Sequence, residues 1–144
     1  MTVYIKIILA VLIIAVVGIQ FVPVERTNPH VTGEIEAPAE VMDILRRSCY
    51  DCHSNETVWP WYSRVAPVSW LVIDDVDEGR EEMNFSDWSA YSEKKKGKKI
   101  HEIWEEVSEG EMPMWYYTIL HSEAELSAAD KETLHKWTEA EGKD

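Results

Sequence analysis

Two cysteines separated by two residues and followed directly by a histidine form the most chemically specific run in the sequence: Cys49-Tyr50-Asp51-Cys52-His53. C-x-x-C-H is the attachment motif of c-type haem. Two thiols on one helical turn can reach the two vinyl groups along one side of a porphyrin, and the adjacent imidazole can bind the iron from beneath the plane. The motif therefore predicts one covalent haem c, with thioethers from Cys49 and Cys52 and with His53 as the proximal iron ligand.

Other uses of a C-x-x-C pair fit the sequence less well. A redox dithiol of the thioredoxin type is expected in a βαβ context, which is missing here. A disulfide between neighbours this close would close a loop too short to stabilise much. A structural zinc site needs four ligands, but there is no second cysteine pair, and distant histidines would have to assemble: His30, His101, His121 and His135. A thiol-redox protein without haem is kept as the third hypothesis.

A second axial ligand for the iron can be sought among the methionines, because electron carriers commonly hold haem iron by His and Met. Met83, Met112 and Met114 are available. Met112 lies in a Gly-Glu-Met-Pro loop 59 positions after His53 (112 − 53), and Pro113 favours an extended backbone before it. We predict Met112 as the distal ligand; Met114, a histidine and an open sixth position are the alternatives.

Helical periodicity describes the elements that must position these residues. Helices are expected from about Ala37 to the cysteines, from after Pro67 to about Asn84, over 93–108, and from Ser127 onward. Their apolar faces comprise Val41, Ile44 and Leu45; Val68, Leu71, Val72 and Val76; Ile100, Ile103, Trp104 and Val107; and Leu134, Trp137 and Ala140. We expect Gly110 to end the third helix, and Ser127 with Asp130 to cap the fourth. No stretch alternates with a period of two, so the predicted fold class is all-α.

The N-terminus reads as a membrane anchor. Thirteen residues from Ile7 to Ile19 have no polar side chain, and the flanking residues extend the run to about the 20 that a membrane-spanning helix needs. A cleaved signal peptide is the alternative, but no small-x-small cleavage pattern follows the run. We therefore predict a membrane anchor over residues 1–22, a linker or loosely packed arm over 23–36, and the haem-binding domain over 37–144.

Charge restricts the partners of this domain. The chain has a formal net charge of −13, and removing residues 1–22, which contain one Lys and no acid, leaves 13 basic against 27 acidic residues, or −14. Such a domain repels nucleic acid and favours a protein partner with a basic docking patch. Aromatic residues close after the motif are expected to line the haem or to pack in the core: Trp59, Trp61, Tyr62 and Trp70.

The order of several short motifs resembles the bacterial haem-binding domain family of small, membrane-anchored, cytochrome-c-like proteins. The similar segments span about Val41 to Trp137: residues 48–55, 59–62, 66–70, 78–80, 84–88 and 110–113, then His121 before Leu126-Ser127. The resemblance implies an all-helical cytochrome-c-like fold and haem binding. One position departs from it: where relatives often carry a His before Glu-Gly-Arg, this chain has Asp74 and Asp75.

Together these features favour an electron-transfer module over an enzyme. One haem, a small domain and an available Met ligand predict a membrane-anchored electron carrier that exchanges electrons with a redox partner. The alternative is a haem-based sensor or peroxidase-like domain with an open or labile sixth position. Because covalent haem attachment in bacteria, as the resemblance implies, takes place outside the cytoplasm, we expect a single pass through the inner membrane with the haem domain on the periplasmic side.

Overall fold

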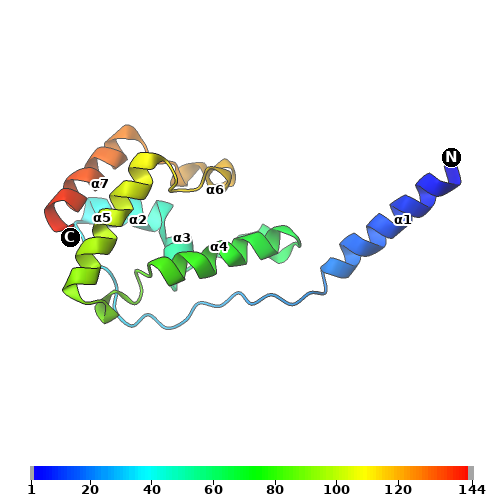
Figure 1. The fold of residues 1–144 in the computed structure, drawn as a ribbon, viewed down its shortest axis with the longest axis horizontal. Helices are drawn as coiled ribbons and strands as arrows, with labels where there is room; N and C mark the ends of the chain where they lie inside the picture. The colour runs from blue at the N-terminus through cyan, green and yellow to red at the C-terminus, as the bar shows by residue number, and fades with distance from the viewer. Residues whose placement is uncertain (1, 143–144) are drawn as a thin grey trace.

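The computed structural model describes residues 2–142, and its regular elements are all helices, with no β-strand among those residues (Figure 1). The all-α prediction is confirmed. Met1, at the start of the predicted anchor, and residues 143–144, at the end of the predicted domain, lie outside the described residues. The elements are α1 (Thr2–Ile19), α2 (Ala39–Ser48), α3 (Tyr50–His53), η1 (Trp61–Arg64), α4 (Val68–Glu82), η2 (Trp88–Ala90), α5 (Glu93–Glu109), α6 (Trp115–Leu120), η3 (Ser122–Ala124) and α7 (Ala128–Glu141).

One helix projects from the domain and the others pack together. α1 extends away from the body, has no buried residue, and is long and apolar enough to cross a membrane (Figure 1). In the body α5 packs against α7, α2 packs against α7, and α3 packs against α4. The core between them is apolar and partly aromatic: Ile35, Val41, Ile44, Leu45, Tyr50, Phe85, Trp88, Ile100, Ile103, Val107, Leu126, Leu134 and Trp137.

Helices α5 and α7 agree with the sequence predictions, because each packs an apolar stripe against this core. Ile100, Ile103 and Val107 of α5 are buried as predicted, and Gly110 ends the helix in the left-handed region with φ of 82°. Ser127 and Asp130 form the predicted capping box at the start of α7.

Helix α4 begins where the sequence predicts but does not bury the predicted face. Val68 and Leu71 remain 43% and 49% exposed, whereas Val76 is buried. The close contacts of α4 use small residues instead, since Ser69 and Gly79 are buried on the side that meets η1 and α3. Two further expectations differ from the structure: Ala140 is exposed, and helix α6 has no counterpart among the predicted helices.

The segment predicted as a linker or loosely packed arm lies along the domain as an arm. The backbone N–H groups of Thr32 and Gly33 donate to the Ser86 carbonyl, and that of Ile35 donates to the Phe85 carbonyl. Ile35 is buried in the core. The arm therefore contributes backbone hydrogen bonds and an apolar side chain to the fold of the domain.

A buried amide network fixes the segment after the C-x-x-C-H run (Cys49–His53) to the loop after α4. The Asn84 side chain donates to Asn55 Oδ1 (2.8 Å) and Asp87 Oδ2 (3.1 Å), and its Oδ1 accepts from the Ser86 N–H (2.9 Å). Ser86 Oγ accepts from the Asn55 N–H (2.9 Å). Because each partner is buried or half-buried, the network holds the residues after His53 in one position.

Replacing Asn84 tests this network. Asn84→Ala leaves the Asn55 carbonyl oxygen and the Ser86 N–H without partners, so the free energy of unfolding should fall by about 1–3 kcal/mol. Denaturant unfolding measures the change, with Ser108→Ala on the exposed face of α5 as a control expected to stay within about 0.5 kcal/mol. A loss for Asn84→Ala no larger than the control's would contradict the role of the network.

Candidate functional site

The two cysteines and the histidine lie on a short helix that continues from α2 after a break. Cys49 ends α2, where its N–H donates to the Leu45 carbonyl (2.9 Å), and it also precedes α3. Its own carbonyl accepts from the N–H groups of Cys52 (3.2 Å) and His53 (2.9 Å). One helical turn therefore places both thiols and the imidazole along one wall.

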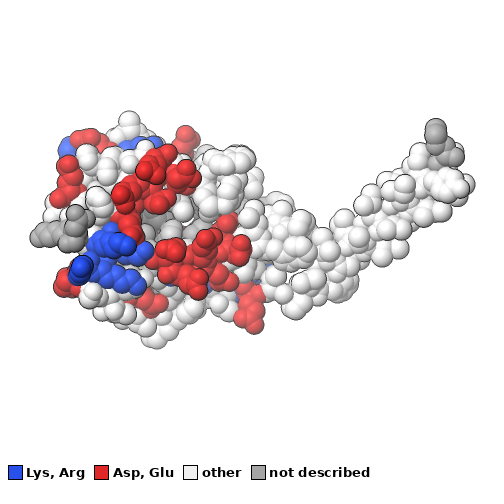
Figure 2. Space-filling model, in the orientation of Figure 1, with Lys and Arg blue, Asp and Glu red and all other residues white. Residues whose placement is uncertain are grey.

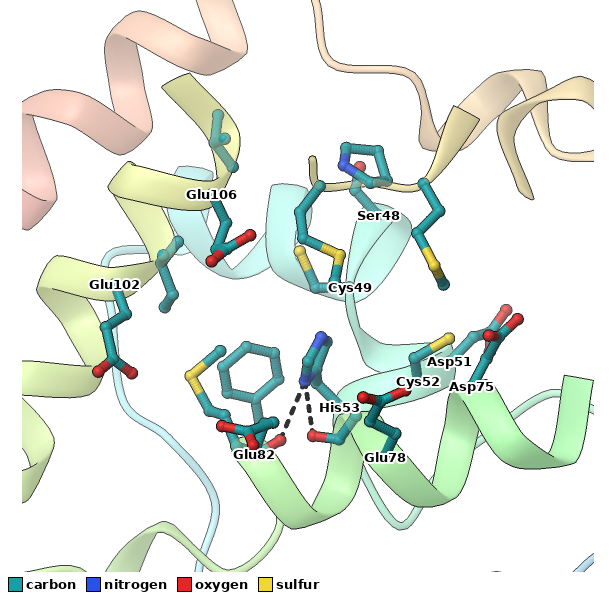
Figure 3. A pocket seen from close by; sticks show the side chains of 18 of the residues that line it. Ser48, Cys49, Asp51, Cys52, His53, Asp75, Glu78, Glu82, Glu102 and Glu106 are labelled. Atoms are coloured by element: carbon teal, nitrogen blue, oxygen red, sulfur yellow. Dashed lines mark hydrogen bonds between the residues drawn. The ribbon is translucent and has the colours of Figure 1, made fainter. Parts of the chain in front are cut away.

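The imidazole of His53 is oriented by α4. Its Nδ1 lies 2.8 Å from the Gly79 carbonyl and 3.1 Å from the Met83 carbonyl (Figure 3). Carbonyls only accept, so Nδ1 carries the proton and donates. Burial lowers the pKa of His53 below its ordinary 6.5, an effect that the two backbone hydrogen bonds oppose. The ring is therefore neutral, with an unprotonated Nε2 available as a metal ligand.

A glycine makes this orientation possible. A Cβ at Gly79 would lie 2.8 Å from the Cys52 carbonyl oxygen and 3.2 Å from the Cys52 Cβ. Any side chain there would separate α4 from α3, and the Gly79 carbonyl would move away from His53. The Glu-Gly-Arg segment thus has a steric reason for its glycine.

A cavity of about 470 Å³ opens beside these residues, within the ~300–1,000 Å³ typical of ligand pockets. It is lined by all four residues predicted as haem ligands: Cys49, Cys52, His53 and Met112. Figure 3 shows the His53 ring pointing up toward Cys49, with Cys52 beside it. The structure brings the four together, and their roles toward haem stay predictions.

The other methionines of the cavity are engaged elsewhere. The Tyr116 hydroxyl lies 2.6 Å from Met114 Sδ and 3.1 Å from Asp75 Oδ1, and these two acceptors share its one proton. Met83 packs against the core, and its carbonyl is one of the acceptors for His53. Within residues 2–142 no hydrogen bond to the Met112 thioether is found. The loop after Gly110 holds Met112 by its backbone N–H, which donates to the Glu106 carbonyl (3.2 Å).

Carboxylates surround the cavity. Seven line it, from α3, α4 and α5: Asp51, Asp75, Glu78, Glu82, Glu102, Glu105 and Glu106. All of these except Glu105 are labelled in Figure 3. Lys99 is the cation among the lining residues, and its Nζ is 2.8 Å from Glu102 and 3.6 Å from Glu82. Burial disfavours the charged lysine, but these two carboxylates outweigh it and raise the pKa of Lys99. The walls therefore carry a strong negative potential.

The thiols are not in the environment of a reactive dithiol. Burial raises the pKa of Cys49 to about 12, and burial with the nearby Asp75 and Asp51 raises that of Cys52 to about 12. Thiol-redox catalysts instead lower a cysteine pKa, because the thiolate is the nucleophile. The two cysteines are also free rather than joined by a disulfide.

The described residues also contain no group of three or more His, Cys, Asp or Glu that is placed to hold a metal ion such as zinc.

One buried polar atom beside the cavity lacks a hydrogen-bond partner. Ser48 Oγ, which belongs to a residue lining the cavity, is without a hydrogen bond. An unsatisfied buried hydroxyl beside the cavity fits a site shaped for a bound group.

The expected aromatic wall is wrong. Trp59, Trp61, Tyr62 and Trp70 do not line the cavity, whereas Phe85 and Tyr117 do. Trp59 instead lies beneath the guanidinium of Arg80 (5.9 Å to the ring centroid).

Arg80 is a structural anchor rather than a solvated surface residue. Its side chain donates to the carbonyls of Ser54 (2.7 Å) and Thr27 (3.0 Å), joining the segment after the C-x-x-C-H run to the arm.

Several lining residues were missing from the sequence predictions. The acids of α5, Glu102, Glu105 and Glu106, flank the buried stripe of Ile103 and Val107. Their position beside an apolar stripe was a signal that could have placed them at a cavity rim. The carbonyls of Gly79 and Met83 carried no such signal, because backbone acceptors leave no trace in residue type.

A family model described as a haem-binding domain matches residues 14–140 of the chain. No curated protein and no solved structure matches the chain.

The close approach at Gly79 generates a prediction. Gly79→Ala forces backbone atoms of α3 and α4 apart, so the free energy of unfolding should fall by about 1–3 kcal/mol. Gly18→Ala is the control, since a Cβ there meets nothing within 4 Å. Thermal unfolding of both variants in the same detergent measures the difference, and equal midpoints would show that α3 and α4 do not need this contact.

Proposed function

Because the chain belongs to the haem-binding domain family, we propose that it is a membrane-anchored, c-type cytochrome-like electron carrier with one covalent haem. Cys49 and Cys52 would form the thioethers, and His53 would be the proximal iron ligand. The observation that carries the proposal is the fixed tautomer of His53, whose Nδ1 donates to two backbone carbonyls and leaves Nε2 free toward the cavity. Metal-binding histidines almost always donate their other ring N–H to such an acceptor.

Different residues of the chain would attach the haem, orient its histidine ligand and exclude water from the cavity. When bound, haem supplies a one-electron iron couple. Cys49 and Cys52 would hold it covalently, while α4 fixes the ring plane of His53. Ile103, Val107 and Phe85 line the cavity as apolar side chains that exclude water. The cavity is thereby suited to electron transfer, which needs a rigid site rather than a reactive group.

Met112 is our candidate for the distal ligand. The thioether of Met114 lies 2.6 Å from the Tyr116 hydroxyl and that of Met83 belongs to a residue packed on the core, which leaves Met112 as the methionine best able to turn to iron. Ligation by both His and Met fills the axial positions and favours an electron carrier over a sensor or peroxidase.

The acidic walls support two further parts of the proposal. Seven carboxylates around the site stabilise the more positive ferric state and so lower the reduction potential. They also favour a redox partner that presents basic residues at the edge of the haem. Single-pass anchoring by α1, with the domain on the periplasmic side of a bacterial inner membrane, is supported by the apolarity of Thr2–Ile19.

Covalent attachment can be tested on a denaturing gel. Because thioether bonds survive denaturation, haem staining of protein made in a host with the c-type maturation machinery should follow the polypeptide. Replacing both cysteines (Cys49→Ser with Cys52→Ser) should abolish the stain, while the wild type and the exposed-site variant Ser122→Ala should retain it. A stain-negative wild-type band would refute the haem proposal.

The distal ligand can be tested by spectroscopy. Met112→Ala should open the sixth position, lower the reduction potential and let the reduced form bind carbon monoxide. Met114→Ala is the matched control and should do much less. If Met114→Ala rather than Met112→Ala removes the sulfur-to-iron charge-transfer band, the ligand is Met114. A wild-type protein that lacks this band and binds carbon monoxide readily would favour a sensor or peroxidase-like domain instead.

A further inference from the structure

Two segments of this acidic domain contain no acidic residue. Residues 57–73 and 112–122 have neither Asp nor Glu, although the chain beyond residue 22 has a net charge of −14 (13 basic, 27 acidic). Arg64 is the one Lys or Arg within them. Charge is therefore distributed unevenly over the domain.

The fold brings the two segments together. The Tyr62 hydroxyl of η1 lies 2.6 Å from His121 Nε2, directly after α6. The Tyr116 hydroxyl of α6 lies 3.1 Å from Asp75 Oδ1 of α4. In Figure 1, α6 and the start of α4 both lie on the side of the domain that faces α1, and Figure 2 shows that end as largely uncharged.

Large apolar side chains stand out from this surface. Trp61, Trp115 and Ile119 are 76%, 73% and 67% exposed. Val68 and Leu71 share one face of α4, and Trp115 and Ile119 share one face of α6, by their spacing of three and four residues. We define the acid-free face by six exposed residues: Trp61, Val68, Leu71, Trp115, Ile119 and Leu120. A patch of this kind marks an interaction surface.

The end of α1 lies at the edge of the acid-free face. The side chain of Gln20, one residue past α1, donates to the Ala66 carbonyl (3.0 Å) and accepts from the Ala66 N–H (3.0 Å). Ala66 is two residues before α4 begins at Val68. If α1 spans a bilayer, the lipid–water interface lies where α1 ends, and hence at the level of this face.

We propose that the acid-free face rests in the interfacial layer of the bilayer that α1 crosses. Trp61 and Trp115 would lie among the headgroups, where tryptophan is enriched, and the aliphatic side chains would reach the acyl boundary. Arg64, exposed beside Trp61, would extend to the lipid phosphates. This inference rests on the membrane anchoring proposed above, and it adds that the domain has one fixed side toward the lipid.

Photolabelling from the lipid tests it. The full-length, haem-loaded protein is placed in phosphatidylcholine nanodiscs that contain a photoactivatable phospholipid, and labelled peptides are identified by mass spectrometry. We expect labels in peptides covering residues 59–73 and 112–121 as well as in α1, and none in α5 or α7. Since the contact is apolar, the labelling should persist at high salt.

A triple variant makes the test specific. Trp61→Gln, Trp115→Gln and Ile119→Gln together should reduce labelling of the domain peptides by about tenfold and leave labelling of α1 unchanged. The control variant combines Lys98→Gln, Glu132→Gln and Lys136→Gln on α5 and α7 and should change nothing. An unchanged haem absorbance spectrum shows that each variant is folded.

The outcomes separate this inference from the proposed function. Labelled α1 with unlabelled domain peptides overturns the inference alone. So does a crosslink to a second copy or another protein, in place of lipid, from a photoreactive residue introduced at position 61 or 115. Unlabelled α1 overturns the anchoring and this inference with it, whereas the haem stain reports on the haem proposal independently.

Discussion

The hydrogen bonds from His53 to the last turn of α4 are the constraint on which the rest of the site depends. Helix ends leave carbonyls without intrahelical partners, and the Met83 carbonyl at the end of α4 is one of these. His53 satisfies it and at the same time fixes its own tautomer. The negative end of the helix dipole also makes the imidazole a stronger electron donor through Nε2. One contact thereby satisfies a carbonyl at the end of a helix and fixes both the orientation and the tautomer of the imidazole.

Other features follow from the need to keep this contact. Gly79 lets α4 approach α3 closely, and the Phe85 N–H donates to the His53 carbonyl (2.8 Å), so the backbone of the histidine is held as well as its ring. Phe85, fully buried, stacks on Tyr50 at 5.3 Å between centroids, inside the C-x-x-C-H run itself. The shape of the site therefore depends on backbone position more than on any single side chain that reaches into the cavity.

The sequence predicted most reliably the features that depend on local patterns. The stripe of Ile100, Ile103 and Val107, the glycine end of α5 and the capping box at Ser127 each follow from a short spacing rule. What it could not predict depended on tertiary packing. Val68 and Leu71 have the spacing of a buried face, but periodicity does not tell whether protein or another apolar medium covers it. Trp59 was expected near the haem because it follows the motif, yet the chain turns and places it under Arg80.

The ordered arm has a consequence for how the domain meets other proteins. Hydrogen bonds from Thr32, Gly33 and Ile35 hold residues between α1 and α2 against the domain, and Arg26 donates to the Ser63 carbonyl (3.0 Å). A free tether of this length would let the domain sample many heights and orientations, and would raise its local concentration near any neighbour in reach. A docked arm removes that freedom. The domain then keeps one position relative to α1. Its encounters with a partner protein therefore depend on the diffusion of that partner.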